Sequence, residues 1–383
     1  MRSAVGAHSR ADRGSHAALA GVRLLSLDAF RGLTIAGMLL VNNIALDTRT
    51  PAQLTHAPWN GGVRFADVIF PWFLLIVGVS ISYSAASAKK REIPIWRTDL
   101  KVLGRVLALV FLGCLIDSSL AKQPLFDLNV LQLIGLAYGT ASLLYALPLS
   151  RRMTVTFVLL VLHGAAIKYL PVPGVGTGVF REDANLIQHL NRTYLSTLHL
   201  DGLLSVIPTA ALVLIGSAFG DLLRWDIKPL PKIPFLLLAS ASLILLGWAW
   251  HFSLPYNKPV WTASYILLTA GLGGVVLTAL YTLVDVAGVR WPPLRWAVFP
   301  LIVYGSNAIA AYVGPILVKV LILREWTWRM PNGVRENLEQ TWLHAAVAHY
   351  GPYWGGWVYT LAYLGIVWLV LLELYRRKIF LRV

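Results

Sequence analysis

The residues best suited to chemistry lie in one short stretch of the sequence, between positions 42 and 67. It holds two adjacent amides, Asn42 and Asn43, a histidine, His56, that begins the segment HAPWNG, and a carboxylate, Asp67. An imidazole accepts protons near neutral pH, a carboxylate can orient it, and an amide can polarise a carbonyl. A lone loop histidine is more often incidental, and an asparagine pair can simply end a helix. The combination of these groups favours an acid–base site.

A second set of charged residues precedes this stretch. Asp28 and Arg31 are three residues apart, which places them on one face of a helix. Fourteen residues separate Asp28 from Asn42, or about 21 Å along a helix, so the two sets lie near opposite ends of one span. Arg31, Arg105 and the basic run 89–91 can contact phosphates. For Asp28 and Arg31, the alternative is an ion pair that anchors the helix at the membrane surface. For the run 89–91, the favoured explanation is an ordinary basic loop on the cytoplasmic side.

Further polar residues interrupt apolar segments. They are Asn129, Gln132, Ser306, Asn307 and Lys319. Hydrogen bonds between helices are the default explanation for the amides and for Ser306. We expect the Lys319 side chain to extend toward the membrane surface.

The composition indicates which elements position these groups. The 383 residues are 57% hydrophobic and only 13% charged, whereas soluble domains carry about 25% charged residues. The apolar residues gather in runs close to the ~20 residues of a membrane-spanning helix, and only helices or closed barrels satisfy the backbone there. We therefore predict an all-α polytopic integral membrane protein, with residues 1–22 as a disordered cytoplasmic tail and residues 23–383 as one membrane domain. The ten expected spans are 27–46, 65–86, 102–118, 129–147, 153–170, 202–223, 233–251, 261–283, 297–322 and 355–374.

The distribution of charge predicts the orientation. Lys and Arg are about twice as frequent in the tails and the even-numbered connections as in the odd-numbered ones, which predicts that both termini are cytoplasmic. The same bias accounts for much of the net charge of +15, so we expect no nucleic-acid partner. The single cysteine, Cys114, excludes an internal disulfide. His344 and His349 are five residues apart, which does not suit one helical face, and we expect no metal.

Several motifs in order resemble the transmembrane acetyltransferase family of heparan-α-glucosaminide N-acetyltransferase and its bacterial relatives. The resemblance runs from about residue 24 to the C-terminus, with Leu133 in place of an expected arginine and slightly longer loops on both sides of His56. The matching motifs are Asp28-Ala29-Phe30-Arg31-Gly32, Val41-Asn42, His56-Ala57-Pro58-Trp59-Asn60-Gly61, Ala66-Asp67-Val68-Ile69-Phe70-Pro71-Trp72-Phe73, Val130-Leu131-Gln132, Asp201-Gly202-Leu203-Leu204-Ser205, Asn257-Lys258, Trp261-Thr262, Gly305-Ser306-Asn307 and Tyr375-Arg376-Arg377-Lys378.

The resemblance implies a reaction across the membrane, in which the acetyl group of cytosolic acetyl-CoA reaches the amine of a glucosamine-like sugar on the periplasmic side. It implies a multi-pass protein of a bacterial inner membrane and a possible homodimer. The catalytic residues it implies are His56, Asn42 and Asp67. The sugar-binding residues are Trp59, Asn60, Asn43, Asp201, Asn257, Lys258 and Asn307. The residues expected to bind acetyl-CoA are Asp28, Arg31, Arg105 and Gln132.

Alternatives remain at this stage. His56 can act as a base in direct transfer or carry the acetyl group itself. A saccharide transporter can use the same polar groups for proton-linked binding, although we find no internal repeat or pair of interrupted helices that would favour one. An O-acyltransferase of periplasmic glycans would use similar machinery with a hydroxyl acceptor.

Overall fold

The computed structural model describes residues 24–288, 291–330 and 333–381, and it confirms the all-α class. The predicted tail 1–22 lies outside the described residues. The helices are α2 (Leu25–Asn43), α3 (Phe65–Lys90), α4 (Ile95–Ala121), α5 (Val130–Leu144), α6 (Leu149–Tyr169), α7 (Leu186–Leu190), α8 (Val206–Leu223), α9 (Pro229–His251), α10 (Ala263–Leu280), α12 (Pro293–Ala297), α13 (Phe299–Ser306), α14 (Ala308–Val318) and α15 (Leu338–Arg376). Shorter 3₁₀ or π segments are Asp47–Arg49, Ala52–Leu54, Asn191–Leu195, Ser196–Leu198, Leu203–Ser205, Tyr281–Ala287 and Lys319–Leu323.

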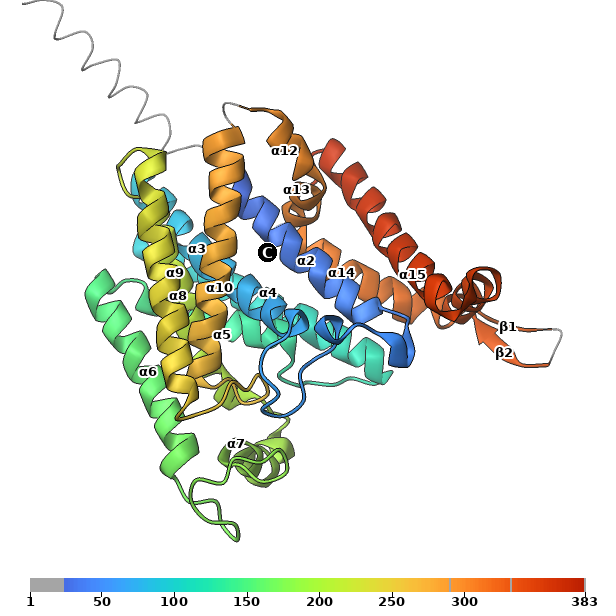
Figure 1. The fold of residues 1–383 in the computed structure, drawn as a ribbon, viewed down its shortest axis with the longest axis horizontal. Helices are drawn as coiled ribbons and strands as arrows, with labels where there is room; N and C mark the ends of the chain where they lie inside the picture. The colour runs from blue at the N-terminus through green and yellow to red at the C-terminus, as the bar shows by residue number, and fades with distance from the viewer. Residues whose placement is uncertain (1–23, 289–290, 331–332, 382–383) are drawn as a thin grey trace, which may run out of the picture.

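The long helices form a bundle (Figure 1) whose helix lengths and apolar composition are those of a polytopic membrane protein. Within the described ranges, seven helices are long and apolar enough to span a bilayer, or eight if the bent pair α13–α14 counts as one span. The remaining two expected spans correspond to α4, with 27 residues, and α5, with 15. Successive long helices alternate in direction, so the bundle has two ends. We call them the His56 end, where α2 finishes and α3 begins, and the Arg31 end, where α2 begins.

The expectation of one continuous helix over 297–322 is wrong. The chain bends by 75° between α13 and α14, because Asn307 adopts φ −130° and ψ 50°, outside the helical region. Its amide is satisfied by backbone far along the chain: Nδ2 donates to the carbonyl of Ile379 (3.0 Å), and Oδ1 accepts from the N–H of Leu381 (2.9 Å). Asn307, at the break, thus connects the middle of this span to the segment after α15 through these two hydrogen bonds.

The connection expected over 323–354 is also partly helical. A short antiparallel hairpin pairs β1 (Thr327–Arg329) with β2 (Arg335–Asn337). Helix α15 then starts at Leu338, beneath a capping box in which Asn337 and Gln340 each accept the other's backbone N–H. The helix kinks at Gly351, whose φ of 78° a residue without a side chain adopts easily. The predicted span 355–374 is the part of α15 beyond this kink.

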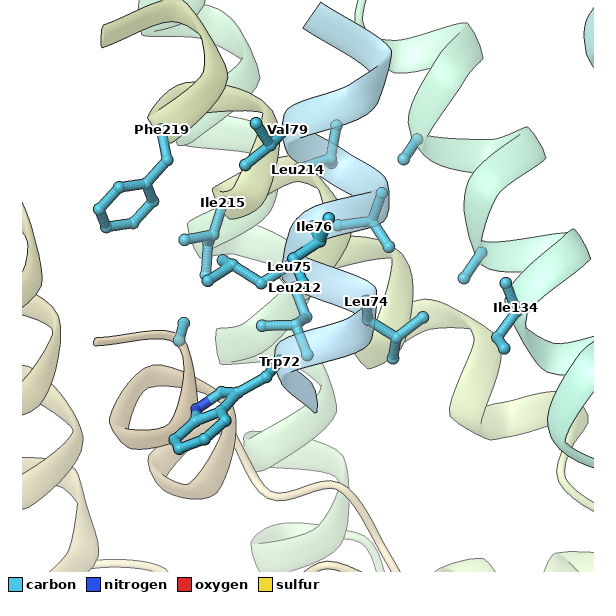
Figure 2. Packing of buried hydrophobic residues seen from close by; sticks show 14 of the residues in the cluster. Trp72, Leu74, Leu75, Ile76, Val79, Ile134, Leu212, Leu214, Ile215 and Phe219 are labelled. Carbon is cyan, nitrogen blue, oxygen red and sulfur yellow. The ribbon is translucent and has the colours of Figure 1, made fainter. Parts of the chain in front are cut away.

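The core of the bundle is the contact between α3 and α8 (Figure 2). In both spans, 72% of the most apolar stretch is buried, against 17% in α9, which exposes large apolar side chains. Small residues permit the close approach: a Cβ on Gly78 would overlap the carbonyl of Val213, and one on Gly216 would overlap that of Leu75. Helix α3, which carries Asp67 at its first turn, is therefore held firmly by its neighbours.

Candidate active site

The first turn of α3 fixes a carboxylate beneath the loop that carries His56. Asp67 is the third residue of α3, and its side chain is only 3% exposed. One oxygen, Oδ2, accepts the backbone N–H groups of Ala57 and Arg64, both at 3.1 Å. A carboxylate at this position satisfies N–H groups that the start of a helix leaves free. These two hydrogen bonds hold the loop of residues 56–64 against the first turn of α3.

The other oxygen of Asp67 holds His56. Oδ1 lies 2.8 Å from Nδ1 of the imidazole, and the ring itself is 56% exposed. A carboxylate can only accept in this bond, so Nδ1 of His56 is the donor and Nε2 is the ring nitrogen that faces away from Asp67. The guanidinium of Arg64 secures the loop by donating to the His56 carbonyl (3.1 Å) and to the Thr55 hydroxyl (2.7 Å). The structure thus brings together His56 and Asp67, the imidazole and the carboxylate that the sequence analysis singles out.

Lys258 reaches the same two groups from the connection between α9 and α10. Its Nζ lies 3.1 Å from Nδ1 and 3.5 Å from Nε2 of His56, and 3.6 Å from Oδ1 of Asp67. Burial lowers the pKa of the Lys258 amine, while the nearby Asp67 carboxylate acts in the opposite direction. The amine therefore contacts both the imidazole of His56 and the carboxylate of Asp67.

Two contacts join the surrounding loops. The Asn257 amide donates to Oδ1 of Asn60 (3.2 Å), so the His56 loop is linked to the connection that carries Lys258. The indole of Trp59 donates to the carbonyl of Phe180 (3.2 Å) and packs on its ring at 5.2 Å. The outer connection 171–201 therefore rests on the His56 loop, and Trp59 and Asn60 lie beside the proposed base.

The two asparagines at the end of α2 differ in their surroundings. Asn43 is the last residue of α2; it donates to the carbonyl of Leu39 (2.8 Å) and accepts from Nζ of Lys319 (3.2 Å). Asn42 is exposed, and its amide makes no hydrogen bond with the described residues. The Lys319 side chain forms an ion pair with Glu339 at 2.7 Å and is only 16% exposed.

A cavity of about 320 Å³ opens within the bundle between α2, α3, α4, α5 and the α13–α14 break. Asp28, Arg31 and Arg105 line it at the Arg31 end, and Met38 lines it one helical turn before Asn42. Arg31 is held by Asp28 (3.3 Å) and by the Ser80 hydroxyl (3.1 Å). The other lining residues are mainly apolar: Ile35, Phe73, Val77, Leu109, Val130, Leu131, Ile134, Tyr138, Ile309, Tyr312 and Leu381.

A second cavity, of about 590 Å³, adjoins the first at the Arg31 end. The two share Arg105 and Tyr138 in their walls, and the guanidinium of Arg105 lies over the Tyr138 ring at 5.2 Å. Its other lining residues include Arg91, Lys101, Ser84, Ser87 and Thr98. Cationic and hydroxyl side chains thus line the cavity that adjoins the apolar chamber.

Comparison with known proteins identifies the family. The family model described as heparan-alpha-glucosaminide N-acetyltransferase, catalytic, matches residues 23–252, which is more than half of the chain. The chain belongs to this family. It is 26% identical to heparan-alpha-glucosaminide N-acetyltransferase of Homo sapiens over 94% of its own length, and 25% identical to that of Mus musculus over 83%. It spans 60% of the human protein and 57% of the mouse protein.

Three residues that the family resemblance implicates lie apart from the groups around His56. Gln132 is fully buried, and its Nε2 donates to Asp117 (2.7 Å) rather than facing the cavity. Asn307 is fully buried with both amide atoms bonded to residues 379 and 381. Asp201 lies in the outer connection and accepts from the Ser196 hydroxyl (2.7 Å). For these three, the structure shows contacts that stabilise the fold.

Other residues of this family member enter the site without a sequence prediction. Arg64 closes the His56 loop, and Tyr265 donates to the backbone carbonyl of Asp67 at 2.6 Å. Lys101 and Tyr138 line the cavities. Arg64 directly precedes α3, so its position before the Ala-Asp motif was a usable signal. Tyr265 lies within an apolar run almost 200 residues away, and only the packing of α10 against α3 brings it to Asp67.

Proposed function

We propose that this protein is a transmembrane N-acetyltransferase that moves the acetyl group of cytosolic acetyl-CoA to the amine of a glucosamine-like sugar on the periplasmic side. The observation that carries the proposal is the His56–Asp67 pair at one end of a bundle whose internal apolar chamber has Arg31 and Arg105 in its wall toward the other end. In this proposal the Arg31 end is cytoplasmic, and the protein is a multi-pass component of a bacterial inner membrane. A homodimer remains a prediction from the family resemblance.

The donor side would accommodate a long molecule with a phosphorylated end. Arg31, Arg105, Arg91 and Lys101 offer cations to phosphates in the two adjoining cavities. The apolar chamber beyond Arg105 suits an extended arm that ends in a thioester. Ala308 and Ile309, at the start of α14, also line the chamber, and no side chain caps the N-terminus of this helix. Free N–H groups and the helix dipole there favour negative charge.

The acceptor side supplies a base. In the proposed step, Nε2 of His56 removes a proton from the sugar ammonium, and the neutral amine attacks the thioester carbonyl carbon. The C–N bond forms as the C–S bond breaks, and the leaving thiolate of CoA takes up the second proton, which the nitrogen loses as it becomes the amide. Asp67 keeps Nδ1 protonated and stabilises the imidazolium that forms. Asn42, about 6 Å along α2 from the chamber residue Met38, is the candidate donor to the carbonyl oxygen.

Reconstitution in liposomes tests this function. Radiolabelled acetyl-CoA is added on the side of the Arg31 end, and glucosamine is enclosed on the other. We expect N-acetylglucosamine in the acceptor compartment with the wild-type protein and none with His56→Ala. The matched control is His349→Ala, because His349 is an exposed histidine in the first part of α15, at the same end of the bundle.

Three results would contradict the proposal. Passage of unmodified glucosamine without acetylation would indicate a transporter. Acetylation of a hydroxyl with no amine product would indicate an O-acyltransferase. Near wild-type turnover by His56→Ala would remove His56 from the chemistry.

A further inference from the structure

Three charged groups of the described chain surround His56. Asp67, from α3, contacts Nδ1 at 2.8 Å, and Lys258, from the connection after α9, approaches both ring nitrogens. Arg64, from the residue before α3, binds the His56 backbone carbonyl. Asp67 is thus the one carboxylate shared by a lysine and a histidine, and its side chain is almost completely buried.

This geometry limits how many protons the three side chains can hold. The proton on Nδ1 points to Asp67, so the Lys258 ammonium cannot donate to that nitrogen, and its charge is balanced by Asp67 at 3.6 Å. A proton added to Nε2 would create a second cation 3.5 Å from Lys258 Nζ. Two cations would then share one carboxylate, and like charges at this distance disfavour the second protonation.

We propose that Lys258 is a positioning residue that keeps His56 in its neutral form by competing with it for Asp67. This inference rests on the proposed function only for the role of His56 as the base. A sugar amine arrives largely as an ammonium, and an imidazole that is already protonated cannot accept its proton. Lys258 would therefore extend activity to lower pH without touching the acetyl group.

The surroundings of Lys258 fit this competition. Its side chain is 26% exposed, so solvent screens its charge only in part. Burial lowers the pKa of its amine, with Asp67 acting against burial, so Lys258 releases a proton more readily than an exposed lysine. Once His56 gains a proton during the reaction, loss of a proton from Lys258 would relieve the excess charge.

The protonation of His56 can be measured without acetyl-CoA or sugar. Diethyl pyrocarbonate modifies neutral imidazoles, and the His56 ring is exposed enough to react. The protein in detergent is labelled between pH 5 and pH 9, and modification of His56 is quantified by peptide mass spectrometry. Wild type is compared with Lys258→Met, Lys258→Gln and Lys258→Arg. Lys168→Met is the control. Lys168 lies in α6 and donates to Ser253, a residue in the same connection as Lys258, and it does not contact His56.

We expect the midpoint of His56 labelling to rise by about one pH unit in Lys258→Met and Lys258→Gln, since a neighbouring like charge is removed. Lys258→Arg and Lys168→Met should retain the wild-type midpoint. An unchanged midpoint in both neutral variants, with the protein still folded, would overturn the inference. A raised midpoint in a protein that transfers no acetyl group would uphold it while contradicting the proposed function.

The rate of transfer gives a second readout. If the inference holds, the acid limb of the pH profile of kcat moves upward in Lys258→Met, and Lys258→Arg restores it. A uniform loss of kcat at every pH, with no displacement of the limb, would assign Lys258 a purely structural role.

Discussion

Gly32 of α2 and Gly305 of α13 lie in direct backbone contact, where the two helices cross. A Cβ added to Gly305 would overlap the carbonyl oxygen of Asp28, and one added to Gly32 would overlap that of Leu301. Asp28 and Gly305 also line the apolar chamber. The crossing therefore sets the position of the proposed acetyl-CoA site as well as the packing of the bundle.

Gly305→Ala should destabilise the protein by about 1–3 kcal/mol, because the backbones must move apart to admit a methyl group. The measurement is the thermal unfolding of the purified protein in detergent. Gly314→Ala is the matched control in α14, since a Cβ there meets no atom within 4 Å. Equal stability of the two variants would show that α2 and α13 can move apart at little cost in free energy.

Asp67→Asn should lower kcat by at least about 100-fold, because an amide can donate to Nδ1 and leave the proton of His56 on Nε2. Acetyl-CoA binding should change little, since Asp67 does not line either cavity. Steady-state rates and equilibrium binding measure the two effects. Asp47→Asn, an exposed carboxylate in the same loop, should behave as wild type. Normal turnover of Asp67→Asn would contradict the orienting role.

Arg105→Gln should raise KM for acetyl-CoA by about tenfold with little change in kcat, because one charge-assisted contact to phosphate is worth about 1.5–3 kcal/mol. Arg105 lies in the walls of both cavities. The control is Arg97→Gln on the same helix, whose guanidinium lies over Trp96 and away from both cavities. If the two variants bound acetyl-CoA equally, the donor would occupy another part of the structure.

Glu339→Gln should destabilise the protein by about 3 kcal/mol, because it leaves the partly buried Lys319 without its ion pair. Glu339 accepts from Lys319 at 2.7 Å and from Arg324 at 2.9 Å, and only 17% of its side chain is exposed. The control is Glu373→Gln, which breaks an exposed pair with Arg377 and should cost less than about 1 kcal/mol. Chemical unfolding in detergent gives both values. Similar losses would mean that Lys319 finds another partner.

Much of the fold could be predicted from the sequence because a bilayer makes long apolar runs unambiguous. The breaks were harder to predict. The residues around Asn307 are apolar enough for a continuous span, and the non-helical turn depends on hydrogen bonds to Ile379 and Leu381, more than 70 residues away. The early start of α15 had a local signal, the Asn337–Gln340 capping box, which the hydropathy pattern concealed.

For the candidate site too, contacts between residues close in sequence could be predicted, and contacts that depend on helix packing could not. Asp67 and His56 are 11 residues apart, so a short loop and the first turn of a helix suffice to bring them together. The position of Lys258 depends on the packing of α10 against α3, which hydropathy does not encode. Gln132 shows the reverse: an amide within a motif can serve the fold, here by pairing with Asp117.

The chamber is built from helices, whereas His56, Trp59, Asn60 and Lys258 come from connections that lie at the ends of those helices. Packed helices tolerate few changes, but surface loops accept substitutions and insertions readily. The connection 171–201 rests on Trp59 and can change without disturbing α2 or α13. Under the proposed function, the outer loops can therefore be exchanged to change the acceptor while the helices that form the proposed acetyl-CoA chamber stay the same.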